Sequence, residues 1–138
     1  MASDRPILFK NARLVDPASG REEPGGVLVR DGVIQDVGPQ ISDAADAQVI
    51  ECGGQVLAPG LIDMCAFSGE PGAAHRETLK SAGEAAAAGG VTTVVSMPET
   101  NPVLDDPAII DFITRRARDT SIVNIRPSAA LTKGLHGE

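Results

Sequence analysis

The first part of the chain alternates short apolar runs with polar turns, a pattern typical of β-structure. Strand-forming residues fill 7–16, whereas the polar, Gly- and Pro-rich stretch 18–26 is expected to be a loop. Residues 27–38 predict a hairpin, because two alternating segments flank an Asp-Gly pair that suits the positive φ angles of a two-residue turn. After a connection, residues 48–59 predict two more short strands around a Gly-Gly turn.

The pattern changes from residue 56. Residues 56–67 form a nearly continuous apolar run, as expected of a strand buried on both faces. Residues 73–89 predict a helix that Gly89-Gly90 ends, with Leu79, Ala82 and Ala86 on one side. Its many alanines would let this helix lie close to a sheet.

A second unit of the same kind follows. Residues 91–98 predict another buried strand, and Asp106 and Pro107 are suited to begin a helix that runs to about Asp119. Three arginines, Arg115, Arg116 and Arg118, are expected on its solvated face. A third strand is expected within 121–131. Alternating strands and helices predict a parallel α/β sheet.

The length of 138 residues limits how much of such a sheet the chain can close. A complete eight-stranded α/β barrel takes roughly 250 residues. Only two or three units fit here, and an open sheet would expose apolar strand edges. The chain is therefore interpreted as a piece of a longer protein, or as one that completes its fold against a partner.

Charge and composition narrow the classes of partner. The formal net charge is −7 and the isoelectric point about 4.7, which argues against nucleic acid or an anionic membrane surface. No apolar run approaches membrane-spanning length, and the start of the chain does not resemble a signal peptide. A cytoplasmic protein is expected, with Cys52 and Cys65 as buried free thiols.

Four separated motifs point to a known family: PGLIDM at 59–64, EPG at 70–72, AAAAGGVTTVVSMPETNP at 85–102 and ALTKGLHGE at 130–138. Together they resemble the N-terminal third of dihydroorotases, which belong to the amidohydrolase superfamily. The resemblance implies that 1–57 is part of a small β-sandwich and that 58–138 is the start of a (β/α)8 barrel. It also implies pyrimidine biosynthesis, through the reversible cyclisation of N-carbamoyl-L-aspartate.

The resemblance further implies a chemical site. In the family the first barrel strand ends in Asp-x-His-x-His, with Leu-Arg and then Glu-Pro-Gly following. The two histidines bind zinc and the arginine grips the substrate carboxylate. After the second strand comes Met-Pro-Asn-Thr, whose asparagine contacts substrate.

This chain keeps the framework of that site and changes its chemical residues. Asp63 is present, but Cys65 and Phe67 occupy the zinc-histidine positions. Gly69 stands in place of the arginine and Glu99 in place of the asparagine. Phenylalanine cannot coordinate a metal, and glycine removes the guanidinium fork. No catalytic, substrate-binding or metal-ligating residue is therefore predicted in this chain, and no cofactor is expected in it, although active family members use zinc.

The main hypothesis is a dihydroorotase-like protein without dihydroorotase activity, with a structural or assembly role. The family resemblance suggests aspartate carbamoyltransferase as a partner, beside a homo-oligomer or the remainder of its own barrel. The alternatives are a metal-dependent cyclic amide hydrolase with an altered metal site, and a small interaction module. The two histidines, His75 and His136, lie outside the family's ligand positions and are expected on a surface helix and in a loop.

Overall fold

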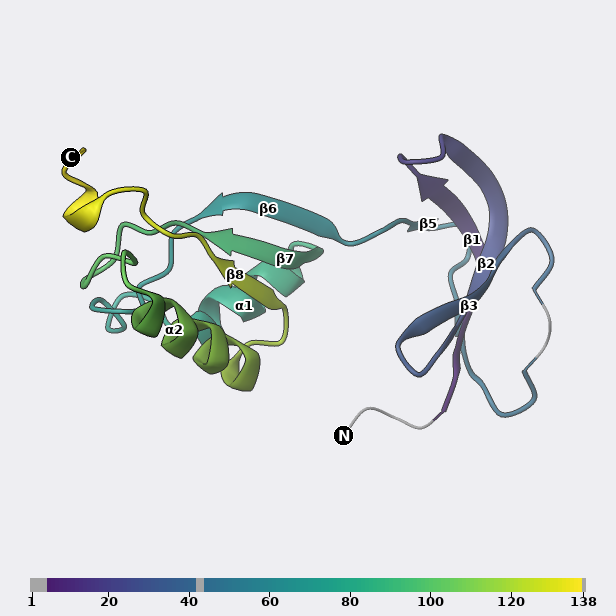
Figure 1. The fold of residues 1–138 in the computed structure, drawn as a ribbon. Coiled ribbons are helices and arrows are strands. Elements are labelled where there is room, and N and C mark those ends of the chain that lie inside the picture. The colour runs from purple at the N-terminus through teal and green to yellow at the C-terminus, as the bar shows by residue number, and fades with distance from the viewer. Residues whose placement is uncertain (1–4, 42–43, 138) are drawn as a thin grey trace. The chain divides into compact units, whose positions relative to one another are not determined.

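A computed structural model describes residues 5–41 and 44–137 of the chain. The chain is mixed α/β and divides into two compact units, Met1–Pro59 and Gly60–Glu138. Each unit has its own sheet (Figure 1) and is described by itself.

The first unit is a single sheet with strand order β3-β2-β1-β4, in which β5 also pairs with β1. Hairpin pairings are antiparallel, whereas β4 and β5 run parallel to β1. A small core forms around Ala12, Leu14 and Val27. The strands are β1 (Ile7–Asp16), β2 (Arg21–Arg30), β3 (Val33–Gly38), β4 (Gln48–Glu51) and β5 (Val56–Leu57).

The predicted loop at 18–26 is wrong, because β2 already begins at Arg21 and pairs with β1 from there. The turn is confined to 17–20, and Arg13 on β1 forms a cross-strand ion pair with Glu22 at 2.5 Å. Gly25 serves close packing: a Cβ there would lie under 3.0 Å from the carbonyl of Gly38. Glycine in this strand therefore marks a close backbone approach and not a loop.

The predicted turns of this unit are confirmed. Asp31 and Gly32 have φ angles of 53° and 72°, as a two-residue hairpin turn with two left-handed residues requires. Gly53 and Gly54 are also left-handed, at 56° and 83°. The predicted connection between β3 and β4 includes residues 42–43, which lie outside the described residues.

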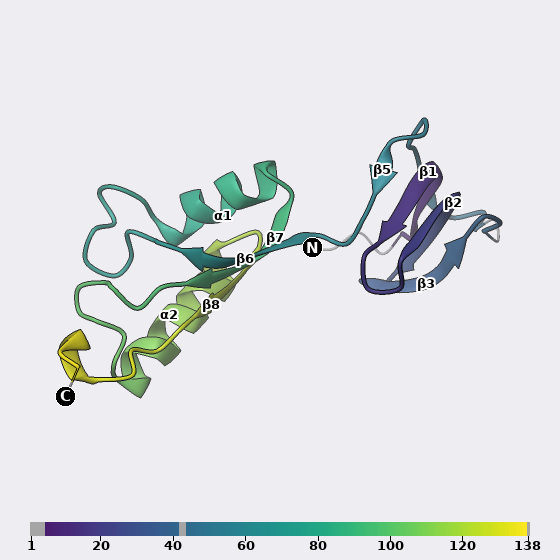
Figure 2. The same cartoon turned by 90° about the horizontal axis from the view of Figure 1, so that it is seen from above.

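The second unit is a three-stranded parallel sheet with two helices, which confirms the predicted α/β pattern (Figures 1 and 2). The strand order is β6-β7-β8. In chain order its elements are β6 (Leu61–Ala66), α1 (Leu79–Ala88), β7 (Val91–Ser96), α2 (Pro107–Thr120), β8 (Asn124–Pro127) and a short 3-10 helix, η1 (Lys133–Leu135).

Both helices of this unit cover one face of the sheet (Figure 1). The core between them consists of buried Leu79, Val94, Leu104, Ile113, Ala117 and Ile125. Helix α1 also packs closely against the end of α2: Gly83 is buried, and a Cβ there would collide with the hydroxyl of Ser121, the C-cap residue of α2.

The helix ends follow ordinary capping chemistry. Asp106 caps α2, since its carboxylate accepts a hydrogen bond from the Ala108 amide at 2.8 Å, and Pro107 follows as predicted. Helix α1, however, begins at Leu79 and not at 73. The reason is a capping box in which Thr78 and Ser81 bond to each other's backbone amides, so residues 73–77 stay outside the helix.

Strand β6 is exposed, contrary to the expectation of a strand buried on both faces. The side chains of Leu61, Ile62 and Met64 are 61–69% exposed. The cause is its place at the edge of the sheet, where β7 is its only neighbour among the described residues. The apolar run suits a buried strand, whereas this chain leaves it open, as an incomplete sheet predicts.

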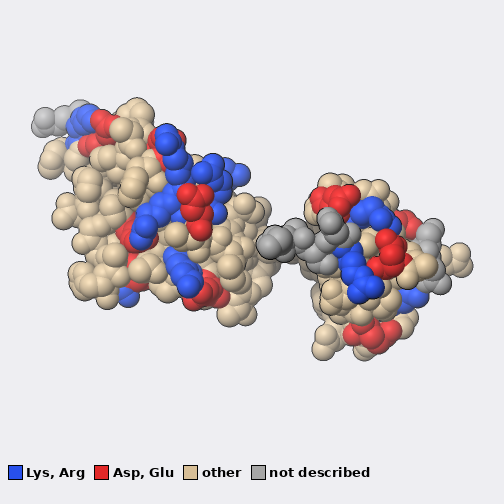
Figure 3. Space-filling view, turned by 90° about the horizontal axis from the view of Figure 1, so that it is seen from below, with Lys and Arg blue, Asp and Glu red and all other residues tan. Residues whose placement is uncertain are grey.

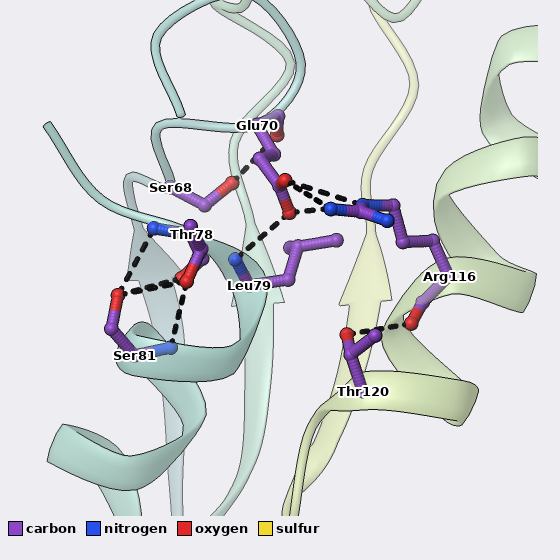
Figure 4. A network of polar contacts seen from close by, with 7 residues as sticks. All are labelled: Ser68, Glu70, Thr78, Leu79, Ser81, Arg116 and Thr120. Carbon is purple, nitrogen blue, oxygen red and sulfur yellow. Dashed lines mark hydrogen bonds and ion pairs between the residues drawn. The ribbon is translucent and has the colours of Figure 1, made fainter. Parts of the chain in front are cut away.

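A buried carboxylate joins the loop after β6 to both helices (Figure 4). Glu70 is only 7% exposed. One of its oxygens accepts a hydrogen bond from the Leu79 amide at the start of α1, at 3.0 Å. Arg116 of α2 donates to the same carboxylate from Nε and from its terminal nitrogen, the latter at 2.7 Å. This bidentate pair fixes the loop against the helix layer.

The same contacts set the charge state of Glu70. Hydrogen bonding by the Arg116 guanidinium, helped by the Leu79 amide, holds the pKa of the Glu70 carboxyl below its usual value despite burial. Correspondingly, the pKa of Arg116 is raised. Arg116 keeps an exposed side chain, as the predicted solvated face requires, and it also binds the buried Glu70, a contact that the sequence did not predict. Arg115 and Arg118 lie on the exposed side too, paired with Asp111 and Asp119.

Acidic and basic side chains are intermingled on the face of each unit shown in Figure 3 and do not gather by sign. Exposed ion pairs of the second unit include Arg118 with Asp119 and Lys80 with Glu84. Within the described residues, no helix is both long and apolar enough to cross a lipid bilayer.

Replacing Ile113 by alanine is expected to lower the free energy of unfolding by about 3 kcal/mol, because the side chain is 1% exposed in the core of the second unit. Phe112, its neighbour on α2, is 59% exposed, so Phe112→Ala is the matched control and should cost less than about 1 kcal/mol. Urea denaturation monitored by circular dichroism measures the free energy of unfolding of both variants and of the unaltered protein. Equal losses would contradict the assigned core.

Replacing Glu70 by glutamine is expected to cost about 2 kcal/mol at pH 7, because it removes the charge that Arg116 and the Leu79 amide bind. The folded-state pKa of Glu70 is lowered, so its contribution is complete above the unfolded pKa of about 4.3 and is lost as the pH falls through the folded value. The stability gap between the two proteins should thus shrink below about pH 4. Exposed Glu99→Gln is the control, and a gap independent of pH would rule out the assigned role.

Candidate functional site at the carboxyl ends of the parallel strands

The loops that follow β6, β7 and β8 meet at one end of the second sheet. Parallel strands bring their carboxyl ends to a common edge, where α/β proteins commonly place their sites. Backbone bonds join the loops: the Asn101 amide donates to the Pro71 carbonyl at 3.2 Å, and the Ala130 amide donates to Leu104 at 2.8 Å. The EPG and MPETNP motifs are thus neighbours in space as well as in the family pattern.

The Asp63 carboxylate is used locally. Its Oδ1 accepts a hydrogen bond from the Cys65 backbone amide at 2.9 Å. Cys65 is an exposed free thiol, so the expectation that it is buried is wrong, while Cys52 is half-buried. The difference follows from the place of Cys65 on the uncovered strand β6.

Phe67 follows directly on β6 and is 62% exposed. Its ring has no atom that can bind a metal. Among the residues that the structure describes, no three His, Cys, Asp or Glu side chains come close enough together to hold a metal ion. The described donors therefore do not fit a zinc ion with the usual four ligands.

A hollow of about 840 Å³ opens between the loops after β6 and β7. It brings together three of the four positions that the sequence analysis predicts to be altered, Phe67, Gly69 and Glu99, whereas Cys65 is not among its lining residues. Arg76 and Glu77, which the sequence did not single out, line it too. The remaining lining residues are Ser68, Pro71, Gly72, Ala73, Thr100 and Asn101.

The charges around this hollow are one cation and two anions, from Arg76, Glu77 and Glu99. Arg76 is missed by the motif comparison because it lies in the turns between EPG and α1 and belongs to no motif. A net negative lining does not favour a dianionic ligand such as carbamoyl aspartate.

The segment after β8 is anchored to the loop before α2. The Asp105 carboxylate accepts the Gly134 amide at 2.7 Å and lies 3.4 Å from the Lys133 ammonium. The Gly134 hydrogen bond and the Lys133 charge hold the pKa of Asp105 below its usual value. Lys133 and Gly134 belong to the ALTKGLHGE motif, and their contact with Asp105 gives that motif a structural reason that sequence alone did not supply.

The two histidines take no part in these contacts. His75 is exposed in a turn and not on a helix, because α1 begins only at Leu79. His136 is exposed just after η1, in agreement with the predicted loop.

Comparison with known proteins identifies relatives across nearly the whole chain. The sequence model of the family described as Dihydro-orotase-like matches residues 54–138. A dihydroorotase of Solibacter usitatus is 42% identical over 133 residues, which are 96% of this chain and 31% of that protein. A dihydroorotase of Anaplasma phagocytophilum is also 42% identical, covering 92% of this chain and 30% of its own length. The chain thus spans about three-tenths of the length of these curated relatives.

Solved structures agree on the fold. The L-hydantoinase (dihydropyrimidinase) of Arthrobacter aurescens matches with a TM-score of 0.83 at 25% identity, covering 94% of this chain and 29% of that protein. A D-hydantoinase matches with a TM-score of 0.74 at 23% identity, over the same shares. The family match, the dihydroorotase relatives and the shared fold lead to one conclusion: this chain belongs to the dihydroorotase-like family of the amidohydrolase superfamily.

Proposed function

We propose that this chain belongs to a dihydroorotase-like protein that does not catalyse dihydroorotate formation and has a structural or assembly role in pyrimidine biosynthesis. The first unit would form part of the family's β-sandwich, and the second would supply the first β/α units of a (β/α)8 barrel. The exposed apolar strand β6 supports this, because a barrel requires a neighbour on that side.

The observation that carries the proposal is the pair Cys65 and Phe67 at the end of the first barrel strand, where the family pattern leads us to expect metal-binding residues. Cys65 and Phe67 stand where the family has two zinc-binding histidines, and the described side chains assemble no alternative metal cluster. Metal-assisted hydrolysis needs a cation that activates water and polarises a carbonyl. Without that ion the retained turns can support structure but not the reaction.

The charge of the hollow supports the same proposal. Gly69 removes the arginine that would bind a carboxylate, and Glu99 adds an anion in place of a neutral amide. Two like charges about 4 Å apart cost about 4 kcal/mol at an effective dielectric of 20. Binding of a dianionic substrate in the family's orientation would therefore be weakened twice, by a lost donor and by repulsion.

The framework that remains is the part needed to hold a shape. The Glu70–Arg116 pair and the Asp105–Gly134 contact both fix loops at the site end of the sheet. Retention of these contacts without the family's chemical residues supports a structural role for the protein. Within the proposed function, aspartate carbamoyltransferase is the partner suggested by the family, with a homo-oligomer as the other assembly.

The second candidate is a metal-dependent cyclic amide hydrolase with an altered metal site. The fold match to proteins named hydantoinases favours it, since a hydantoin ring is a cyclic ureide without the carboxylate that dihydroorotate carries, and so it does not need the missing arginine. It requires metal ligands other than the described side chains.

Zinc content and turnover test the proposal directly. The purified full-length protein, supplied with zinc, is expected to hold far less than one zinc per chain and to cyclise carbamoyl aspartate no faster than buffer. A dihydroorotase relative, assayed in parallel, is the positive control. Stoichiometric zinc with dihydroorotate formation would refute the proposal, and stoichiometric zinc with hydantoin hydrolysis alone would establish the second candidate.

Assembly is tested separately by sedimentation velocity. Mixing the full-length protein with aspartate carbamoyltransferase of the same organism is expected to give a species heavier than either component alone. Each protein run by itself at the same concentration is the control. Unchanged sedimentation of both components at micromolar concentration would remove aspartate carbamoyltransferase from the proposal.

A further inference from the structure

Gly69 lies against backbone atoms of the loop that follows it. A Cβ at this position would come within 3.0 Å of the carbonyl oxygens of Ala73 and Glu77 and of the Glu77 nitrogen. Real Cβ atoms essentially never approach other atoms so closely. All three atoms belong to the main chain, so no side-chain rotation can relieve the collision.

The requirement for glycine here is one of space. Gly69 is not in the left-handed region, in contrast to Gly72 at φ +97° in the same loop. An alanine at 69 would therefore be compatible with the local φ angle and would fail only by collision. The Gly69→Ala substitution therefore tests close packing alone, without backbone strain from a left-handed φ angle.

The loop cannot move away without breaking other contacts. The Ala73 amide donates to the Gly69 carbonyl at 2.6 Å, and the Arg76 amide donates to Ala73 at 2.8 Å. At its far end Thr78 caps α1, and Glu70 holds the Leu79 amide. The loop is thus folded onto Gly69 and attached to the helix layer on both sides of the contact.

We propose that residues 69–77 form a closed loop that only glycine at 69 permits, and that this loop excludes an arginine from the position where the family motif has one. The proposal rests on the proposed loss of the dihydroorotase reaction and deepens it. The missing arginine is then more than a lost side chain, because main-chain atoms fill the space where its first carbon would lie.

The closed loop also explains the charge pattern of the hollow. Its fold places Arg76 and Glu77 at the lining, beside Phe67 and Glu99. Opening the loop to admit an arginine at 69 would move both residues. Restoring the family's residues one by one would therefore change the shape of the hollow before it restored any contact with a carboxylate.

The test compares Gly69→Ala and Gly69→Arg with the unaltered full-length protein. Both variants are expected to lower the melting temperature by about 4 °C or more, because the collision is with main chain. Native-state trypsin cleavage after Arg76 reports on the loop itself and should become roughly tenfold faster in both variants. Peptide mass spectrometry identifies the cleavage site.

Gly89→Ala is the matched control, since Gly89 has an ordinary φ of −87° and its nearest neighbour would be 3.5 Å from a Cβ. It should leave the melting temperature within about 2 °C and the cleavage after Arg76 unchanged. Unaltered stability and cleavage in Gly69→Ala would overturn the closed loop, whatever the protein catalyses. Turnover of carbamoyl aspartate by the unaltered protein would instead contradict the proposed function and leave the stability result untouched.

Discussion

The buried carboxylate of Glu70 is the contact on which the arrangement of the second unit depends. It satisfies the first amide of α1 and binds the guanidinium of Arg116 on α2, so one side chain ties the loop after β6 to both helices. A carboxylate that is 7% exposed would be costly without such partners. Leu79, whose amide it accepts, is itself fully buried in the core between sheet and helices. The polar contact and the apolar core therefore hold the same helix end in place.

The residues around the hollow fall into two groups, those that packing fixes and those that are exposed. Glu70 and the turn it belongs to are fixed by packing, and they persist although the neighbouring chemical residues differ from the family pattern. Phe67 and Glu99 are exposed and make no comparable demand on the structure. Exposed positions around a hollow can change with little effect on folding, whereas the buried Glu70 carboxylate cannot lose Arg116 without being left partly unsatisfied. The proposed loss of chemistry, with retention of the framework, is the outcome expected when only the fold remains under constraint.

Much of the fold was predictable because its signals are local. The Asp31-Gly32 turn and the Asp106-Pro107 helix start depend on backbone preferences of those residues, and both are found in the structure. The wrong start of α1 has a local cause, the Thr78–Ser81 capping box, whereas two other misses involve partners distant in sequence. Gly25 was assigned to a loop because its contact with another strand is invisible locally, and the contact of the exposed Arg116 with Glu70 was missed because Glu70 lies 46 positions away. Family resemblance supplied the identities of the altered site positions, but it could not show which of them share one hollow.

Gly69 matters both for the family pattern and for the packing of the loop that follows it. In the family pattern this position is an arginine, so glycine here lacks the guanidinium that would bind a carboxylate. In the structure the glycine also serves packing, because the carbonyls of Ala73 and Glu77 occupy the space that a side chain at 69 would need. The loop that supplies those carbonyls is held on one side by the Thr78 cap and on the other by Glu70, so the buried contact at Glu70 also supports the proposed closed loop. In the proposed closed loop Gly69 is part of the packing, and placing an arginine there would require the loop to refold.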